Sequence, residues 1–197
     1  MRARGLLVTA AVLGAIGTAA AAELVAPEYP ESLRDKPFAV SVVVSGPVSG
    51  GKATDAEVLY SDGAEAFASA ARAAFEENPF DDGRTRATLW YRFRLLQDTK
   101  VTDLSREAPR ELEAPPELLE SVAPEFPPGA PSLRMELALE LLVGPDGEVW
   151  YASCRDEQAD PLYCERALAA ARRFKFSPAT VDGEATAAWF SFTLEFR

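Results

Sequence analysis

Histidine is absent from this sequence of 197 residues. Its absence removes the commonest general base near neutral pH and the commonest zinc ligand. A Ser-His-Asp triad, a Cys-His dyad and any metal site built on imidazole are therefore excluded. We expect a binding protein rather than an enzyme, without a cofactor or a metal ion.

Basic residues are also in short supply. The chain has 20 Lys and Arg against 31 Asp and Glu, which gives a formal net charge of -11 at pH 7. An acidic surface repels the phosphates of nucleic acids, so we expect no nucleic-acid partner. An excess of negative charge is typical of a protein whose charged surface keeps it soluble.

Long apolar runs are lacking except at the N-terminus. There Arg2 and Arg4 precede an apolar stretch, and Ala20-Ala21-Ala22 offers small residues for cleavage. This arrangement predicts a signal peptide over residues 1–22 and a periplasmic mature protein. The alternative is an uncleaved inner-membrane anchor over residues 5–22 that leaves the rest of the chain facing the periplasm. That run is near the lower length limit for a membrane span and rich in Ala and Gly, which favours cleavage.

Cysteine is rare as well. The two cysteines, Cys154 and Cys164, both lie beyond the predicted signal peptide. In an oxidising compartment, an isolated pair this close in sequence predicts a disulfide. Two buried free thiols are the alternative.

What the sequence does contain is an internal repeat. The segment Val25-Ala26-Pro27-Glu28-Tyr29-Pro30 returns as Val122-Ala123-Pro124-Glu125-Phe126-Pro127, a match that chance does not explain. An alternating strand pattern follows in both copies, and its apolar residues correspond: Phe38, Val40, Val42 and Val44 with Met135, Leu137, Leu139 and Leu141. A Gly-containing turn comes next, at Gly46 to Gly51 and at Gly144-Pro145-Asp146-Gly147, and a second strand follows each turn.

The rest of each copy predicts a helix and a closing strand. The first helix is expected over about residues 65–77, and the second begins near Asp160-Pro161, where Asp suits the N-cap and Pro the first helical position. The inward residues of the closing strands correspond: Leu89, Tyr91, Phe93 and Leu95 with Phe190, Phe192, Leu194 and Phe196.

These patterns predict an α+β fold of two tandem small domains. Each is a three-stranded antiparallel sheet packed on one main helix, in the order β-β-α-β after a short lead-in segment. The predicted domains cover residues 23–96 and 121–197. Residues 97–120 are acidic, contain several prolines and lack strong apolar periodicity, so they are predicted to be a linker.

The order of these motifs resembles the C-terminal domain of the TonB family. The resemblance rests on the aromatic-Pro lead-in, the Gly-rich turn, the Ala-rich helix and the segment Arg173-Phe174-Lys175-Phe176-Ser177-Pro178-Ala179 that follows the second helix. The second copy is the better match, because Phe75-Glu76-Glu77-Asn78-Pro79 is a degraded form of that segment. The resemblance implies a periplasmic domain that binds a short segment of an outer-membrane transporter, added as a strand to an exposed sheet edge.

Two departures from that family bear on function. The sequence lacks the long Pro-rich spacer of an energy transducer, and it lacks the histidine by which the anchor engages the inner-membrane motor. We therefore expect a non-catalytic protein-binding module with a partner protein in the cell envelope. A TonB-type energy transducer, or an accessory of outer-membrane transport, is the alternative.

The closing strand of the second copy, Glu184 to Phe196, is the predicted partner-binding edge. Burial of its inward residues fixes its register, and its other face carries Trp189, Ser191, Thr193 and Glu195. A long unprotected edge invites strand addition by a partner segment or by a second copy of the chain. Two alternatives stay open: the linker or the first copy covers this edge, and the outward Trp90 and Trp189 serve packing between the domains.

The lead-in motif is the last predicted site. It comprises Tyr29-Pro30 in the first copy and Phe126-Pro127 in the second. Aromatic side chains at such positions usually pack rather than bind, so we expect both to plug their cores.

Overall fold

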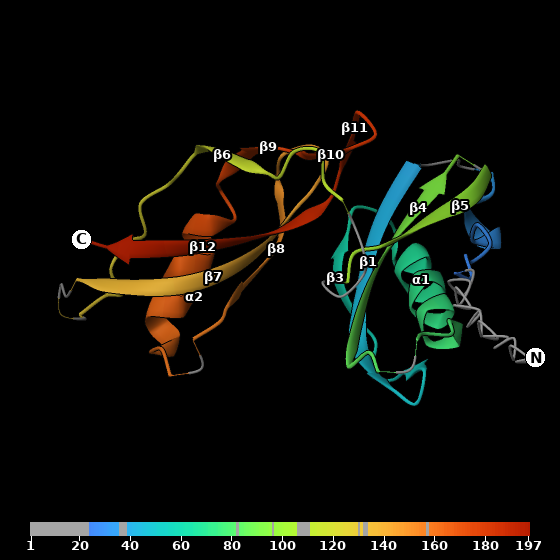
Figure 1. Ribbon diagram of the computed structural model, residues 1–197, viewed down its shortest axis with the longest axis horizontal. Coiled ribbons are helices and arrows are strands. Elements are labelled where there is room, and N and C mark those ends of the chain that lie inside the picture. The colour runs from blue at the N-terminus through green and yellow to red at the C-terminus, as the bar shows by residue number, and fades with distance from the viewer. Residues whose placement is uncertain are drawn as a thin grey trace, which may run out of the picture.

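The protein has a mixed α+β structure with antiparallel sheets. The computed structural model describes residues 24–35, 39–81, 83–95, 97–105, 111–129, 131, 134–156 and 158–197. The predicted signal peptide over residues 1–22 lies outside these ranges. Two units lie side by side along the longest axis, each with one α-helix against a sheet (Figure 1).

The described residues of 24–105 form the N-terminal unit. Its elements are η1 Glu31–Leu33, β1 Ala39–Ser49, β2 Lys52–Ala53, β3 Glu57–Ser61, α1 Glu65–Glu77, β4 Arg86–Arg94 and β5 Gln97–Asp103. The described residues of 111–197 form the C-terminal unit. Its elements are β6 Glu117–Glu120, β7 Met135–Val143, β8 Val149–Cys154, α2 Pro161–Ala171, β9 Lys175–Ser177, β10 Ala179–Val181, β11 Glu184–Thr186 and β12 Ala188–Phe196.

The main sheets of the two units share one arrangement. In the N-terminal unit β1 lies between β3 and β4, and in the C-terminal unit β7 lies between β8 and β12. The registers match as well: Val42 pairs with Tyr91 and Leu139 with Phe192. These are the residues that the sequence repeat puts in correspondence, so the repeat extends to the pairing of strands far apart in the chain.

Each helix buries an apolar face on its own sheet. Helix α1 buries Phe67, Ala71 and Phe75, which recur at intervals of four and therefore share one face. Helix α2 buries Tyr163, Ala167, Ala170 and Ala171. As predicted, α2 starts with Pro161 in its first turn and is capped by Asp160, whose Oδ1 accepts a 2.9 Å hydrogen bond from the Leu162 backbone N–H. Each helix thus forms a separate core with its sheet.

The linker prediction for residues 97–120 differs from the structure at both of its ends. Residues 97–103 form β5, which pairs antiparallel with β4, and residues 117–120 form β6, which pairs with β9. Only Val101 of β5 is strongly apolar, and it packs against the N-terminal core while Thr99 is buried. Because backbone pairing with β4 supplies most of the support for β5, the hydrophobic pattern alone did not reveal it.

The closing strands also differ in extent from the prediction. Residues 184–196 form two strands, because β11 pairs with β10 while β12 pairs with β7. The hairpin β10–β11 turns at Asp182 and Gly183, both with positive φ (53° and 74°), which suits a tight two-residue turn. In the N-terminal unit Leu95 lies beyond β4 with φ 41° and is 56% exposed, so it does not extend the buried face as predicted.

Candidate functional site

Strand β12 forms one border of the C-terminal sheet. It pairs with β7 along its whole length, from Ala188 opposite Val143 to Phe196 opposite Met135. Within the described residues β7 is the only strand that pairs with it. We call the opposite backbone side of β12, over residues 190–196, the β12 edge. Unpaired backbone donors and acceptors along such an edge can form hydrogen bonds with an added strand.

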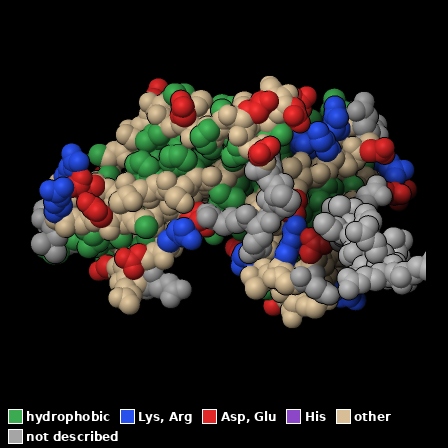
Figure 2. All heavy atoms as spheres, in the orientation of Figure 1, with side chains coloured by type: hydrophobic (Ala, Val, Ile, Leu, Met, Phe, Trp, Pro, Cys, Tyr) green, Lys and Arg blue, Asp and Glu red, His purple; other side chains and the backbone are tan. Residues whose placement is uncertain are grey.

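The side chains along the β12 edge alternate as predicted. Leu194 and Phe196 are buried in the C-terminal core, whereas Ser191 and Thr193 are exposed. Phe190 and Phe192 are only half-buried. Their rings contact Phe176 and Phe174, with centroid distances of 5.1 and 5.3 Å. Figure 2 shows hydrophobic side chains gathered on this face, between β12 and the pair β6–β9. Apolar surface therefore lies beside the unpaired backbone.

Charge is concentrated at the C-terminal end of the β12 edge. Glu195 accepts hydrogen bonds from Arg197 (Nε to Oε2, 2.7 Å) and forms an ion pair with Arg134 (Nε to Oε1, 2.5 Å). The hydrogen bond from Arg197 and the charge of Arg134 hold the pKa of Glu195 below its usual value. Two guanidinium groups surround the carboxylate of Glu195 there, and Glu136 lies opposite Glu195 on β7, so charges of both signs meet at this end.

Trp189 faces the N-terminal unit rather than the β12 edge. It belongs to a group of residues that we call the inter-unit cluster. The members of this cluster are buried Val43, Trp90, Leu104, Leu142 and Ala187 and half-buried Leu59, Tyr60, Trp150, Tyr151 and Trp189. Its indole Nε1 donates a 2.9 Å hydrogen bond to the carbonyl oxygen of Leu104. Tyr60 stacks on Trp150 with a centroid distance of 4.5 Å and an interplanar angle of 6°. Packing between the units, one of the two alternatives left open by the sequence, therefore accounts for both Trp90 and Trp189.

The corresponding edge of the N-terminal unit is occupied. Strand β4 pairs with β1 on one side and with β5 on the other. The register places Val101 of β5 opposite Tyr91, the residue that corresponds to Phe192. A segment of this chain thus already fills the position that is open at β12.

Both lead-in aromatics plug their cores as predicted. Tyr29 makes edge-to-face contacts with Phe67 and Phe93, at centroid distances of 5.0 and 6.3 Å. Phe126 makes an edge-to-face contact with Tyr163 and a tilted contact with Phe196, at centroid distances of 6.4 and 5.5 Å. Of the prolines that follow them, Pro30 immediately precedes η1 and Pro127 is buried. The lead-in motif therefore contributes to packing.

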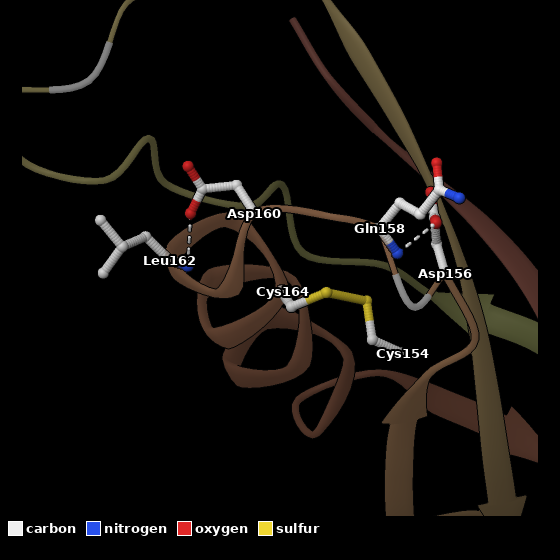
Figure 3. Close-up of a disulfide and its surroundings, with 6 residues drawn as sticks. All are labelled: Cys154, Asp156, Gln158, Asp160, Leu162 and Cys164. Carbon is white, nitrogen blue, oxygen red and sulfur yellow. Dashed lines mark hydrogen bonds between the residues drawn. A yellow bond between two sulfur atoms is a disulfide. The ribbon is translucent and has the colours of Figure 1, made fainter.

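The two cysteines are bonded, as predicted. Cys154 ends β8 and Cys164 lies in α2, with their Cα atoms 6.0 Å apart (Figure 3). The bond ties α2 to β8, the border of the sheet opposite β12. It therefore fixes the scaffold and leaves the β12 edge unobstructed.

A polar cleft of about 510 Å³ lies between the outer faces of the two sheets. Polar side chains within each wall already bond to one another. On one wall the Ser45 and Thr88 hydroxyl oxygens are 3.0 Å apart, and Arg86 Nε donates to Ser45 Oγ at 3.0 Å. Arg155 and Glu140 on the other wall form an ion pair with a 3.6 Å Nε–Oε1 distance. These partners make the cleft a weaker candidate for ligand binding than the β12 edge.

Ser49 and Lys52 are a serine and a lysine close together at the β1–β2 turn. Ser49-Gly50-Gly51-Lys52 has the S-x-x-K spacing of some serine acyl enzymes. Both side chains are exposed, and the two residues pair across the β1–β2 turn. Neither residue lines the polar cleft between the two sheets.

Comparison with models of protein families, with curated proteins and with solved structures finds no match for this chain. No helix within the described ranges combines the length and apolar character needed to cross a membrane.

Proposed function

We propose that this chain is a non-catalytic periplasmic binding protein that captures an extended segment of another cell-envelope protein on the β12 edge. Its two units are copies of one β-β-α-β domain of the TonB C-terminal kind, and the second copy binds the partner. The observation that carries the proposal is the uncovered β12 edge, with half-buried Phe190 and Phe192 beside it. An added strand would pair with the open backbone and remove apolar ring surface from water.

The other sheet borders are less suited to strand addition. Strands β3 and β8 meet each other at the inter-unit cluster through the stack of Tyr60 on Trp150. Strand β5 carries Asp98, Lys100 and Asp103, and charged residues, Lys above all, protect a sheet border against pairing. Strand β12 has no charged residue from Ala188 to Leu194. This contrast in charge favours β12 as the docking strand.

The occupant is a different protein rather than a second copy of the chain. Each copy carries a net charge of -11, so two copies repel each other. A periplasmic location rests on the predicted signal peptide and agrees with the disulfide, since such bonds persist in oxidising compartments.

Site-specific photo-crosslinking tests the proposal. A photoreactive amino acid replaces Thr193 on β12 or, as a matched control, Lys100 on β5, and both variants are exported in the native host. We expect one envelope protein to be crosslinked through a short extended segment at Thr193 and not at Lys100. A crosslink to the chain itself, equal crosslinking at both positions, or no crosslink from a variant with a native circular dichroism spectrum would refute the proposal.

A further inference from the structure

The chain contains its own example of a strand added to the equivalent edge. Strand β5 lies beside β4 in an antiparallel arrangement, from Gln97 opposite Arg94 to Asp103 opposite Leu89. Matching registers with the central strands put β4 and β12 in correspondence, with Leu89 at the place of Phe190 and Tyr91 at the place of Phe192. The side chains that β5 packs beside β4 therefore indicate which side chains are missing beside the β12 edge.

The side chains of β5 alternate between the two faces of the sheet. Val101, opposite Tyr91, packs against the N-terminal core, and Thr99 on the same face is buried. Lys100 is exposed and Thr102 is half-buried, and both point to the other face. On the C-terminal sheet the place beside Phe192 has no such occupant within the described residues, and its ring is half-buried. A β-branched aliphatic side chain fits that place because it packs well on a pleated surface.

We propose that the segment captured by β12 runs antiparallel to it and sets a β-branched aliphatic residue beside Phe192, with a polar residue on either side. This inference rests on the proposed function and specifies the partner segment. The antiparallel direction places the N-terminal end of the segment next to Glu195 and its C-terminal end next to Phe190. The N-terminal end of the segment then lies where Arg134 and Arg197 are already bound to Glu195.

The probe is a heptapeptide with the sequence of β5, Gln97 to Asp103, titrated into the isotope-labelled intact protein and followed by NMR. The native β5 is held on β4 by a direct chain connection, so its high effective concentration prevents exchange with the free peptide. We expect shift changes in the backbone amides of residues 190–195 and none in those of β4. A peptide with the Val101→Asp change should bind at least tenfold more weakly, while one with Val101→Ile should bind as the original does.

Spin labels on the peptide determine its direction relative to β12. A label at the N-terminus should broaden the amide signal of Glu195, and a label at the C-terminus should broaden that of Phe190. The reverse pattern, equal binding of the Asp peptide, or no response of β12 at millimolar peptide overturns the inference.

These outcomes are distinguishable from failure of the proposed function. If Thr193 crosslinks a partner segment that runs parallel or lacks the aliphatic residue, this inference fails and the proposed function stands. If the peptide behaves as expected and Thr193 crosslinks no partner, the proposed function fails and the antiparallel chemistry of the β12 edge stands.

Discussion

The indole Nε1 of Trp189 lies 2.9 Å from the carbonyl oxygen of Leu104, to which it donates a hydrogen bond. Trp189 is near the start of β12, and Leu104 directly follows β5. The bond therefore joins the end of β5, which covers the edge of β4, to the start of β12, whose own edge is open. It fixes the two units relative to each other without using the backbone of residues 190–196.

Replacing Trp189 with Phe should loosen the contact between the units. Phe keeps an aromatic ring in the inter-unit cluster but cannot donate to Leu104, and the loss of one buried hydrogen bond costs about 1 kcal/mol. Calorimetry should show a lower unfolding temperature, and small-angle X-ray scattering a broader distribution of shapes. Trp150→Phe is the matched control, since it also shortens an aromatic ring of the inter-unit cluster but loses only a hydrogen bond to Asp146 within its own unit. Equal scattering profiles for both variants would contradict the role assigned to Trp189.

Removing the disulfide should destabilise the C-terminal unit. The bond closes a short loop between residues 10 apart in sequence, and the chain-entropy account gives about 2–3 kcal/mol for such a loop. Urea unfolding of a Cys154→Ser, Cys164→Ser variant should show this loss. A reducing agent should lower the stability of the native protein to the same level and leave the variant unchanged. Thiol labelling of the denatured, unreduced native protein would find reactive cysteines if the bond were absent.

Two glycines with nearly equal φ should differ in their tolerance of alanine. Gly147 has φ 78°, and an added Cβ would clash with the carbonyl oxygen of Phe176. Gly183 has φ 74° with nothing near an added Cβ. Gly183→Ala should cost about 1–2 kcal/mol from backbone strain alone, and Gly147→Ala clearly more, because the turn must also shift. Chemical denaturation of both variants measures the difference, and equal losses would show that the close approach to Phe176 is unimportant.

Alkaline pH should weaken the fold through two tyrosines. Burial raises the pKa of Tyr60, and the charges of Asp62, Asp146 and Glu148 raise it further. Burial also raises the pKa of Tyr91, against a hydrogen bond from Asn78 that lowers it. Because the fold favours the neutral phenols, their contribution is complete below the ordinary pKa of 10.0 and is lost as pH rises above it. The free energy of unfolding should therefore fall above about pH 10.

Tyr60→Phe is the variant that isolates one of these groups. It keeps the stack on Trp150 and removes the ionisable hydroxyl, so its stability should fall less steeply above pH 10 than that of the native protein. Urea unfolding at a series of pH values measures this dependence. Parallel curves for the two proteins would exclude Tyr60 as a source of the alkaline loss.

The sequence revealed the elements in which local pattern and burial agree. Strands β7 and β12 alternate with a clear period of two, Asp160 and Pro161 mark the start of α2, and the cysteine pair is isolated. Strand β5 was missed because its pairing with β4 needs little apolar surface. The same reasoning explains β6, in which Leu119 is 64% exposed and only Leu118 packs against the core.

The candidate site was predicted in part for a similar reason. The period of two identified the outward positions Ser191 and Thr193, but it does not tell solvent from a second unit of the same chain. Trp189 shares their face and yet contacts the N-terminal unit, because the two sheets approach each other at that end of β12. Contacts between separate cores depend on their relative placement, which a single period does not encode.

All three tryptophans of the chain, Trp90, Trp150 and Trp189, lie in the inter-unit cluster, while the two separate cores are lined by Phe and Tyr. The intrinsic fluorescence of the protein, excited at the tryptophan band, therefore reports on the contact between the units and not on either core. A red shift of the emission without a change in far-ultraviolet dichroism would mean that the units have parted while both remain folded.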